Sequence, residues 1–358
     1  MAGMPLRDHL RLPRRPAAEA TTGDQHQASA PLVDDAPGGG WVPDGMDGFE
    51  RLTLGLEEDK QGQNIVTVVR RRAPEGQRDP DRRPVLALHG WSDYFYNAPL
   101  AEAFDDAGYA FHAVDLRHYG RSLRPGQTPG WTDDLRRYDA DIAAALAAAA
   151  RDHPLPPVLL GHSTGGLVAS LWADRNPGRL AALVLNSPWL QTHGGTPARA
   201  VARLATRPLA RARPYGTLRL PRVDFYWRSL SAEADGEWDL VPAWRAPWSF
   251  DLPHAWLDAV LAGHRRVARG LSIDVPVLVL VSDTGHRGLR YGEAMLAADI
   301  ILNPSAMARR ALRLGREVTV QQHAGALHDV YASPEPVRSR AMADTLRWLA
   351  PVAPPRED

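Results

Sequence analysis

The first apolar pattern along the chain is an alternation of hydrophobic and polar residues. Leu52, Leu54 and Leu56 alternate with polar or small residues, and Val66 and Val68 repeat the spacing shortly afterwards. A period of two residues is typical of a strand with one buried face. The sequence therefore predicts two early strands that pair as a hairpin.

After residue 80 the alternation gives way to short continuous apolar runs. Such runs predict strands that are buried on both faces, as in a parallel sheet covered by helices. The runs occupy residues 84–90, 109–115, 157–163, 180–187, 275–283 and 317–323. Between and after them, apolar residues recur every three or four positions at 135–146 and 342–349, which predicts helices. The fold class expected is α/β, with a mostly parallel twisted sheet and helices on both faces.

The texture of the sequence divides the chain into segments. Residues 1–45 have no periodicity and are expected to form a disordered tail, and the core is expected to occupy 46–190 and 271–352. Residues 191–270, rich in Arg, Pro and Trp, contain no strand-like run and are too long for a plain loop. We expect them to form a mainly helical lid insertion; a decorative helical subdomain is the alternative.

Composition narrows the class of partner. Forty-two basic and forty-two acidic residues cancel, so the charge pattern of a nucleic-acid binder is missing. The chain has no cysteine, which excludes disulfides and thiolate metal sites. Neither a signal-peptide pattern nor a membrane-spanning apolar window is present in the sequence. We expect a cytoplasmic protein without stable membrane anchoring, whose partner is a small molecule.

A glycine-rich turn between a predicted strand and a predicted helix carries the main candidate for chemistry. Residues 161–165 read GHSTG, which fits the GxSxG pattern of a nucleophile elbow around Ser163. In so tight a turn, only residues without Cβ avoid collision with the neighbouring strand and helix, and Gly161 and Gly165 fill those positions. The alternative is a chance GxSxG in a glycine-rich turn.

A serine nucleophile needs a base and an acid that orients the base. His328, just past the last predicted strand, is the candidate base. His323 is expected to end that strand, and His162 to point away from its neighbour Ser163. Two residues compete for the acid: Asp283, at the end of the strand 275–283, and Asp299 further along the chain.

Acyl transfer also requires donors for an oxyanion. The backbone N–H of Thr164, directly after the candidate nucleophile, is one expected donor, and the N–H of Trp91, after His89-Gly90, is the other. The aromatic residues at 91 and 94–96 either line an apolar pocket or simply pack under the insertion.

Together with the GHSTG elbow, the stretches LHGWSD (88–93) and GALHDVY (325–331) make the chain resemble the α/β-hydrolase superfamily. It looks most like the branch of lysophospholipases, monoacylglycerol lipases and serine aminopeptidases, from about residue 49 to 350. The stretch 111–125 is also similar to a motif of these enzymes, although His118 stands where many relatives have glycine. The resemblance implies Asp299 as the acid, because ADIILNP (298–304) matches the turn that carries it in the family, even though residues 284–297 lengthen the connection from the strand.

The resemblance implies an ester-hydrolysing enzyme that needs no cofactor and no metal, with the insertion as its lid. Tryptophans in the insertion favour a substrate with an apolar acyl group, although an aromatic ester would fit the same argument. Peptidase or amidase activity, acyl transfer to an alcohol, and a non-catalytic ligand-binding scaffold remain alternatives. A homodimer is a further candidate arrangement, because an exposed tryptophan-rich face can form an interface.

Overall fold

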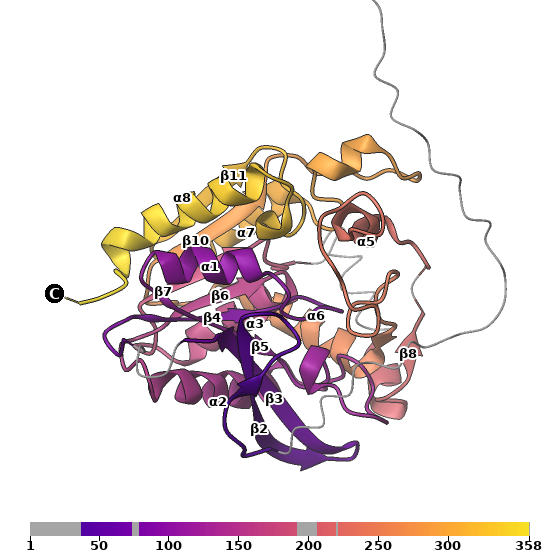
Figure 1. Ribbon diagram of the computed structural model, residues 1–358. Helices are drawn as coiled ribbons and strands as arrows, with labels where there is room; N and C mark the ends of the chain where they lie inside the picture. Colours follow the sequence, from indigo (N-terminus) through magenta and orange to yellow (C-terminus); the bar gives the residue numbers. More distant parts are fainter. Residues whose placement is uncertain (1–36, 74–78, 192–205, 220, 358) are drawn as a thin grey trace, which may run out of the picture.

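The computed structural model of the protein describes residues 37–73, 79–191, 206–219 and 221–357 (Figure 1). Its centre is a nine-stranded sheet with the strand order β1-β2-β3-β5-β4-β6-β7-β10-β11. From β5 to β11 all neighbouring strands are parallel. These strands are β4 (Pro84–Leu88), β5 (Ala110–Asp115), β6 (Val158–His162), β7 (Ala182–Asn186), β10 (Val277–Ser282) and β11 (Val318–His323). Each lies within one of the predicted apolar runs, and the mostly parallel α/β fold is confirmed.

The predicted early hairpin forms the other edge of the sheet. β2 (Phe49–Asp59) and β3 (Gly62–Arg71) pair antiparallel, and β3 joins the parallel part by pairing antiparallel with β5. A short strand, β1 (Val42–Pro43), pairs with β2. A strand therefore occurs before residue 46, the boundary expected from the sequence, whereas residues 1–36 of the expected tail lie outside the described residues.

Helices cover both faces of the sheet. α1 (Ala98–Asp106) and α8 (Val337–Val352) pack on one face. On the other face lie α2 (Tyr138–Ala150), α3 (Thr164–Arg175), α6 (His254–Arg269) and α7 (Pro304–Ala311). Short 3₁₀ helices occupy Gly120–Ser122, Leu135–Arg137, Glu293–Ala297 and Val330–Ala332. In the described part of the chain, no helix is both long and apolar enough to cross a membrane.

The insertion contributes a helix to the core, and other parts of it lie beside the sheet. α6 packs against α3, and the side chains of Trp256 and Val260 are fully buried in the core. The preceding residues contain α5 (Phe225–Leu230) and a small antiparallel pair, β8 (Thr217–Leu218) with β9 (Leu252–Pro253). Figure 1 shows α5 and β8 to the right of the sheet. Residues 192–205, part of the expected lid, are outside the described residues.

Candidate active site

Ser163 lies in the sharp turn between β6 and α3. Its backbone has φ +51° and ψ −112°, a conformation that residues other than glycine rarely adopt. The flanking chain holds the turn in place: the Ser163 N–H donates to the Asn186 carbonyl (3.0 Å), and the Ser163 carbonyl accepts from the Trp189 N–H (2.9 Å). The strained serine is thus fixed by β7 and by the residues that follow it.

Gly161, Gly165 and Gly166 allow this turn to pack. A Cβ at position 161 would lie 2.7 Å from the Gly165 carbonyl oxygen, and a Cβ at 165 would lie 2.3 Å from the His89 carbonyl oxygen. A Cβ at 166 would approach Pro188 to 2.8 Å. All three separations are below van der Waals contact, so the spacing of the glycines follows from close approach of backbone segments. The third glycine has this role as well, in addition to the two predicted at 161 and 165.

The three predicted triad residues form one hydrogen-bonded chain. Ser163 Oγ is 2.9 Å from His328 Nε2, and His328 Nδ1 is 2.9 Å from Asp299 Oδ2. Asp299 is fully buried, His328 is nearly so, and Ser163 is 9% exposed. A carboxylate can only accept, so Nδ1 carries a proton and Nε2 is left to accept the serine proton. This is the tautomer that a base acting on Ser163 requires.

The course of the chain after β10 determines which of the two candidate acids lies beside His328. The segment 284–297 leaves the strand end and returns: Asp299 N–H donates to the Thr284 carbonyl (2.9 Å), and His286 N–H donates to the Asp299 carbonyl (3.0 Å). Asp299 therefore lies beside the residues that directly follow the strand. Asp283 is exposed and accepts a hydrogen bond from the Gly325 N–H (3.3 Å). The structure brings Asp299, and not Asp283, to His328.

The other two histidines considered have separate contacts. His323 ends β11, as the sequence predicts. His162 Nδ1 donates to the Asn186 carbonyl (3.1 Å), and its ring centroid lies 5.0 Å from that of His328. Burial lowers the pKa of His162, so this ring stays neutral beside the candidate base. It therefore adds no positive charge next to His328.

The loop between β4 and α1 (residues 89–97) passes next to the serine. A Cβ at Gly90 would lie 3.3 Å from Ser163 Cβ, which places Trp91, the expected oxyanion donor, one residue beyond this contact. The Trp91 ring packs on Trp256 of α6, with ring centroids 3.9 Å apart. Tyr94 packs against Trp244 and Tyr96 against Trp238, also of the insertion, with centroids 5.1 and 5.3 Å apart. The aromatic cluster of this loop thus joins the core to the insertion.

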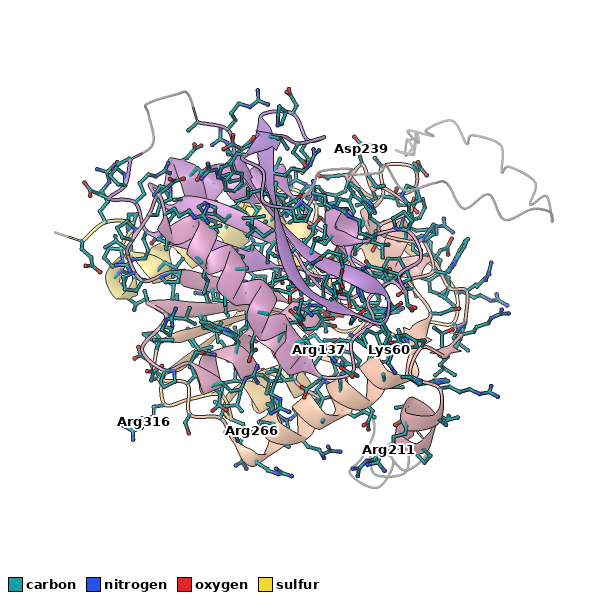
Figure 2. The ribbon with its side chains drawn as sticks, turned by 90° about the horizontal axis from the view of Figure 1, so that it is seen from below. Lys60, Arg137, Arg211, Asp239, Arg266 and Arg316 are labelled. Atoms are coloured by element: carbon teal, nitrogen blue, oxygen red, sulfur yellow. The ribbon has the colours of Figure 1, made fainter. Side chains whose placement is uncertain are left out.

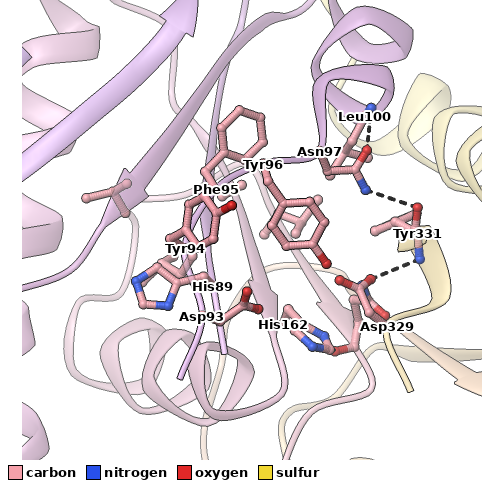
Figure 3. Close-up of a pocket in the computed structure, with 15 residues that line it drawn as sticks. His89, Asp93, Tyr94, Phe95, Tyr96, Asn97, Leu100, His162, Asp329 and Tyr331 are labelled. Atoms are coloured by element: carbon pink, nitrogen blue, oxygen red, sulfur yellow. Dashed lines mark hydrogen bonds between the residues drawn. The ribbon is translucent and has the colours of Figure 1, made fainter. Parts of the chain in front are cut away.

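A cavity of about 50 Å³ lies behind this loop (Figure 3). Its lining includes Asp93, Tyr96, His162 and Asp329, but no side chain of the triad. The Tyr96 hydroxyl is buried and, among the described residues, has no hydrogen-bond partner. Figure 3 shows this hydroxyl directed toward Asp329. The cavity is small, its lining is mainly apolar with a few polar side chains, and it lies beside the triad.

Two residues that the sequence reasoning missed fix the loop that carries His328. Asn186, at the end of β7, donates from Nδ2 to Asp329 Oδ1 (2.6 Å) and accepts from the Val330 N–H (3.0 Å). Asp329 also accepts the N–H groups of the first turn of the Val330–Ala332 helix. The only signal in the sequence is their position, one directly after the base and the other at a strand end.

Comparison with known proteins adds the family. The sequence pattern of the serine aminopeptidase S33 family (Hydrolase_4) matches residues 79–286, more than half of the chain. A monoacylglycerol lipase of Mycolicibacterium smegmatis is 27% identical over 282 residues, which cover 76% of this chain and 89% of the lipase. Phospholipase YtpA of Bacillus subtilis is 35% identical over 109 residues, covering 30% of this chain and 40% of the phospholipase.

Solved structures agree on the fold. A monoacylglycerol lipase from Paleococcus ferrophilus superposes with a TM-score of 0.57 at 22% identity, covering 76% of this chain and 96% of that one. A carboxyl esterase from Bacillus coagulans, in complex with glycerol, gives a TM-score of 0.61 at 15% identity, with 84% and 98% covered. The resemblance seen in the sequence is thus confirmed: this chain is a lipase- and esterase-like α/β-hydrolase and belongs to the serine aminopeptidase S33 family.

Proposed function

We propose that the protein hydrolyses carboxylic esters through an acyl-enzyme on Ser163. The observation that carries this proposal is the pair of 2.9 Å hydrogen bonds that link Ser163 to His328 and His328 to Asp299. A buried chain of nucleophile, base and acid activates a serine hydroxyl that is otherwise a poor nucleophile.

In the proposed reaction, Ser163 Oγ attacks the ester carbonyl while its proton moves to His328 Nε2. Asp299 keeps the ring oriented and stabilises the imidazolium. The N–H groups of Trp91 and Thr164 receive the oxyanion, and the N-terminus of α3 adds the positive end of its dipole. His328 then protonates the leaving alcohol, and water that is deprotonated by His328 releases the acid from Ser163.

For the substrate we propose an ester with an apolar acyl group, of the monoacylglycerol, lysophospholipid or simple carboxylic ester type. Support comes from the aromatic rings that the insertion brings to the loop 89–97, since aromatic side chains offer large apolar contact areas. The monoacylglycerol lipase of Mycolicibacterium smegmatis, aligned over most of both chains, is consistent with this class.

A second candidate is peptidase or amidase activity, because the family carries the name of a serine aminopeptidase and amide hydrolysis uses the same constellation. Acyl transfer to an alcohol other than water would also proceed through the same acyl-enzyme. The remaining alternative, a non-catalytic ligand-binding scaffold, gives no reason for the hydrogen bonds between Ser163, His328 and Asp299.

The test is turnover of p-nitrophenyl esters from acetate to decanoate, of a monoacylglycerol, of a lysophospholipid and of an aminoacyl p-nitroanilide. We expect ester turnover that increases beyond acetate, together with labelling by a fluorophosphonate probe. Ser163→Ala should abolish both, while Ser339→Ala, an exchange on the outer side of α8, should change neither. Turnover of the anilide alone would favour the peptidase, and neither labelling nor turnover in the wild type would refute the enzyme.

A further inference from the structure

The loop 89–97 is fixed to the core at both ends. His89 Nε2 accepts a hydrogen bond from the Leu116 N–H (3.1 Å), and its Nδ1 donates to the Gly90 carbonyl (2.8 Å). Near the other end, the Phe95 N–H donates to Asp115 Oδ1 (2.8 Å). In the described part of the chain, the side chains of the middle of the loop, Ser92 to Tyr94, form no hydrogen bond to the core.

The insertion holds this middle part through three consecutive residues. The contacts are Phe250 N–H to Ser92 Oγ (3.1 Å), Val241 N–H to Tyr94 Oη (2.9 Å), and the Arg245 guanidinium to the Asp93 carboxylate. Ser92 has φ +51°, a strained value for a residue with a side chain. A strained backbone persists only where its surroundings hold it, so these contacts determine the path of the chain beyond Trp91.

The ion pair between Asp93 and Arg245 is buried: Asp93 is 3% exposed and Arg245 is 5% exposed. Other charged side chains of the insertion, such as Arg211 and Asp239, lie on the outside of the molecule, as Figure 2 shows. Burial opposes the charge of Asp93, but the neighbouring guanidinium outweighs it and lowers the pKa of the carboxyl group. Among the described residues, Arg245 is the only hydrogen-bond partner of this carboxylate.

We propose that Arg245 is a positioning residue for the loop 89–97. Its charge keeps the Asp93 carboxylate buried, and this holds the loop where the Trp91 N–H can donate to an oxyanion formed at Ser163. The inference rests on the proposed ester hydrolysis. Without the guanidinium, the buried carboxylate of Asp93, next to the strained Ser92, loses the charge that compensates it. The carboxylate can then be hydrated only if the loop moves. Such a movement takes the loop that carries the donor away from the nucleophile.

The test separates a lost loop position from a lost substrate contact. Arg245→Met should lower kcat by about 100-fold, the range that follows removal of one oxyanion donor, and leave KM within about threefold. Asp93→Asn/Arg245→Met removes the buried charge as well, so we expect it to recover kcat to within about tenfold of the wild type. Binding of a trifluoromethyl ketone, which forms an oxyanion on the serine, should weaken in parallel with kcat.

Arg266→Met is the matched control. Arg266 also joins the insertion to the core, through Asp174 of α3, but it lies in the last turn of α6 and no contact with the loop 89–97 is found among the described residues, so kcat and KM should both be unchanged. If Arg245→Met raises KM instead, and the double variant does not recover, Arg245 contacts the substrate and the inference is wrong. If Arg245→Met keeps kcat within threefold of the wild type, the inference is also wrong.

Two further readouts keep the test decisive. If Arg245→Met does not fold, the double variant decides: a folded double variant with a loss of kcat beyond about 100-fold would overturn the proposal. A wild type without ester turnover or fluorophosphonate labelling would refute the proposed function itself, whereas an active wild type with an unaffected Arg245→Met refutes only the role of Arg245.

Discussion

Replacing Asp299 by asparagine tests the triad most directly. Asp299 Oδ1 accepts two backbone hydrogen bonds, from the Ile301 N–H (2.8 Å) and the Leu302 N–H (2.7 Å), while Oδ2 faces His328. In Asp299→Asn the amide oxygen must keep the backbone contacts, so the amide NH₂ is directed at His328 Nδ1. The imidazole then carries its proton on Nε2 and cannot accept the proton of Ser163.

The loss expected from this wrong tautomer is about 10⁴ in kcat, the scale that the same exchange has in a serine protease triad. This corresponds to about 5.5 kcal/mol of activation free energy. Volume and the two backbone hydrogen bonds are retained, so we expect the folded structure to persist. The assay is kcat for p-nitrophenyl butyrate, with thermal unfolding as the check on folding.

Asp283→Asn is the matched control, because Asp283 is exposed and its carboxylate accepts a hydrogen bond only from the Gly325 N–H among the described residues. We expect its kcat to stay within about twofold of the wild type, since surface exchanges of this kind have small effects. More than a tenth of wild-type activity in Asp299→Asn, or a large loss in Asp283→Asn, would refute the assignment of the acid.

Three further predictions concern stability, measured by urea unfolding. Gly165→Ala places a Cβ 2.3 Å from a backbone oxygen and should lower the free energy of unfolding by about 3 kcal/mol or prevent folding. Gly40→Ala, whose Cβ would have no atom within 4 Å, should have little effect. Equal stability of the two variants would contradict the packing argument. Asn186→Ala leaves Asp329 without its 2.6 Å partner and should cost about 1–3 kcal/mol; no loss would show that the His328 loop is held otherwise. Burial lowers the pKa of His112 to about 3, so on acidification the unfolded chain takes up the His112 proton before the folded chain does, and the free energy of unfolding falls as the pH drops below about 6.5. Between pH 7 and 5, His112→Asn should therefore lose about 2 kcal/mol less free energy of unfolding than the wild type. An identical pH dependence of the two proteins would refute this.

The elements of the core could be predicted because their pattern is local. A strand buried on both faces appears as a continuous apolar run, and an elbow appears as glycines at fixed positions around a serine. Ser163 and His328 follow from such signals, since Ser163 directly follows β6 and His328 lies in the loop after β11.

The acid could not be predicted from strand position alone. Position after the strand favours Asp283, but the chain makes an excursion over 284–297 and returns, so that Asp299 occupies the place beside the strand end. Nothing in the periodicity of the sequence indicates such a return. The family motif points to Asp299, the residue that the structure places at His328, because the motif belongs to the returning turn and not to the strand.

The remaining parts of the site depend on contacts between distant residues. Asn186 and Asp329 meet because β7 and the loop after β11 converge on the same edge of the sheet, 143 residues apart in sequence. Arg245 meets Asp93 across 152 residues, although the arginine lies among many others in the insertion. Hydropathy favours an exposed position for each of these arginines. The buried one is distinguished only by a carboxylate on another element, and that carboxylate is itself buried because the arginine is present. A pair of this kind is determined by the tertiary structure as a whole, which is why the structure, and not the sequence, connects the insertion to the loop beside Ser163.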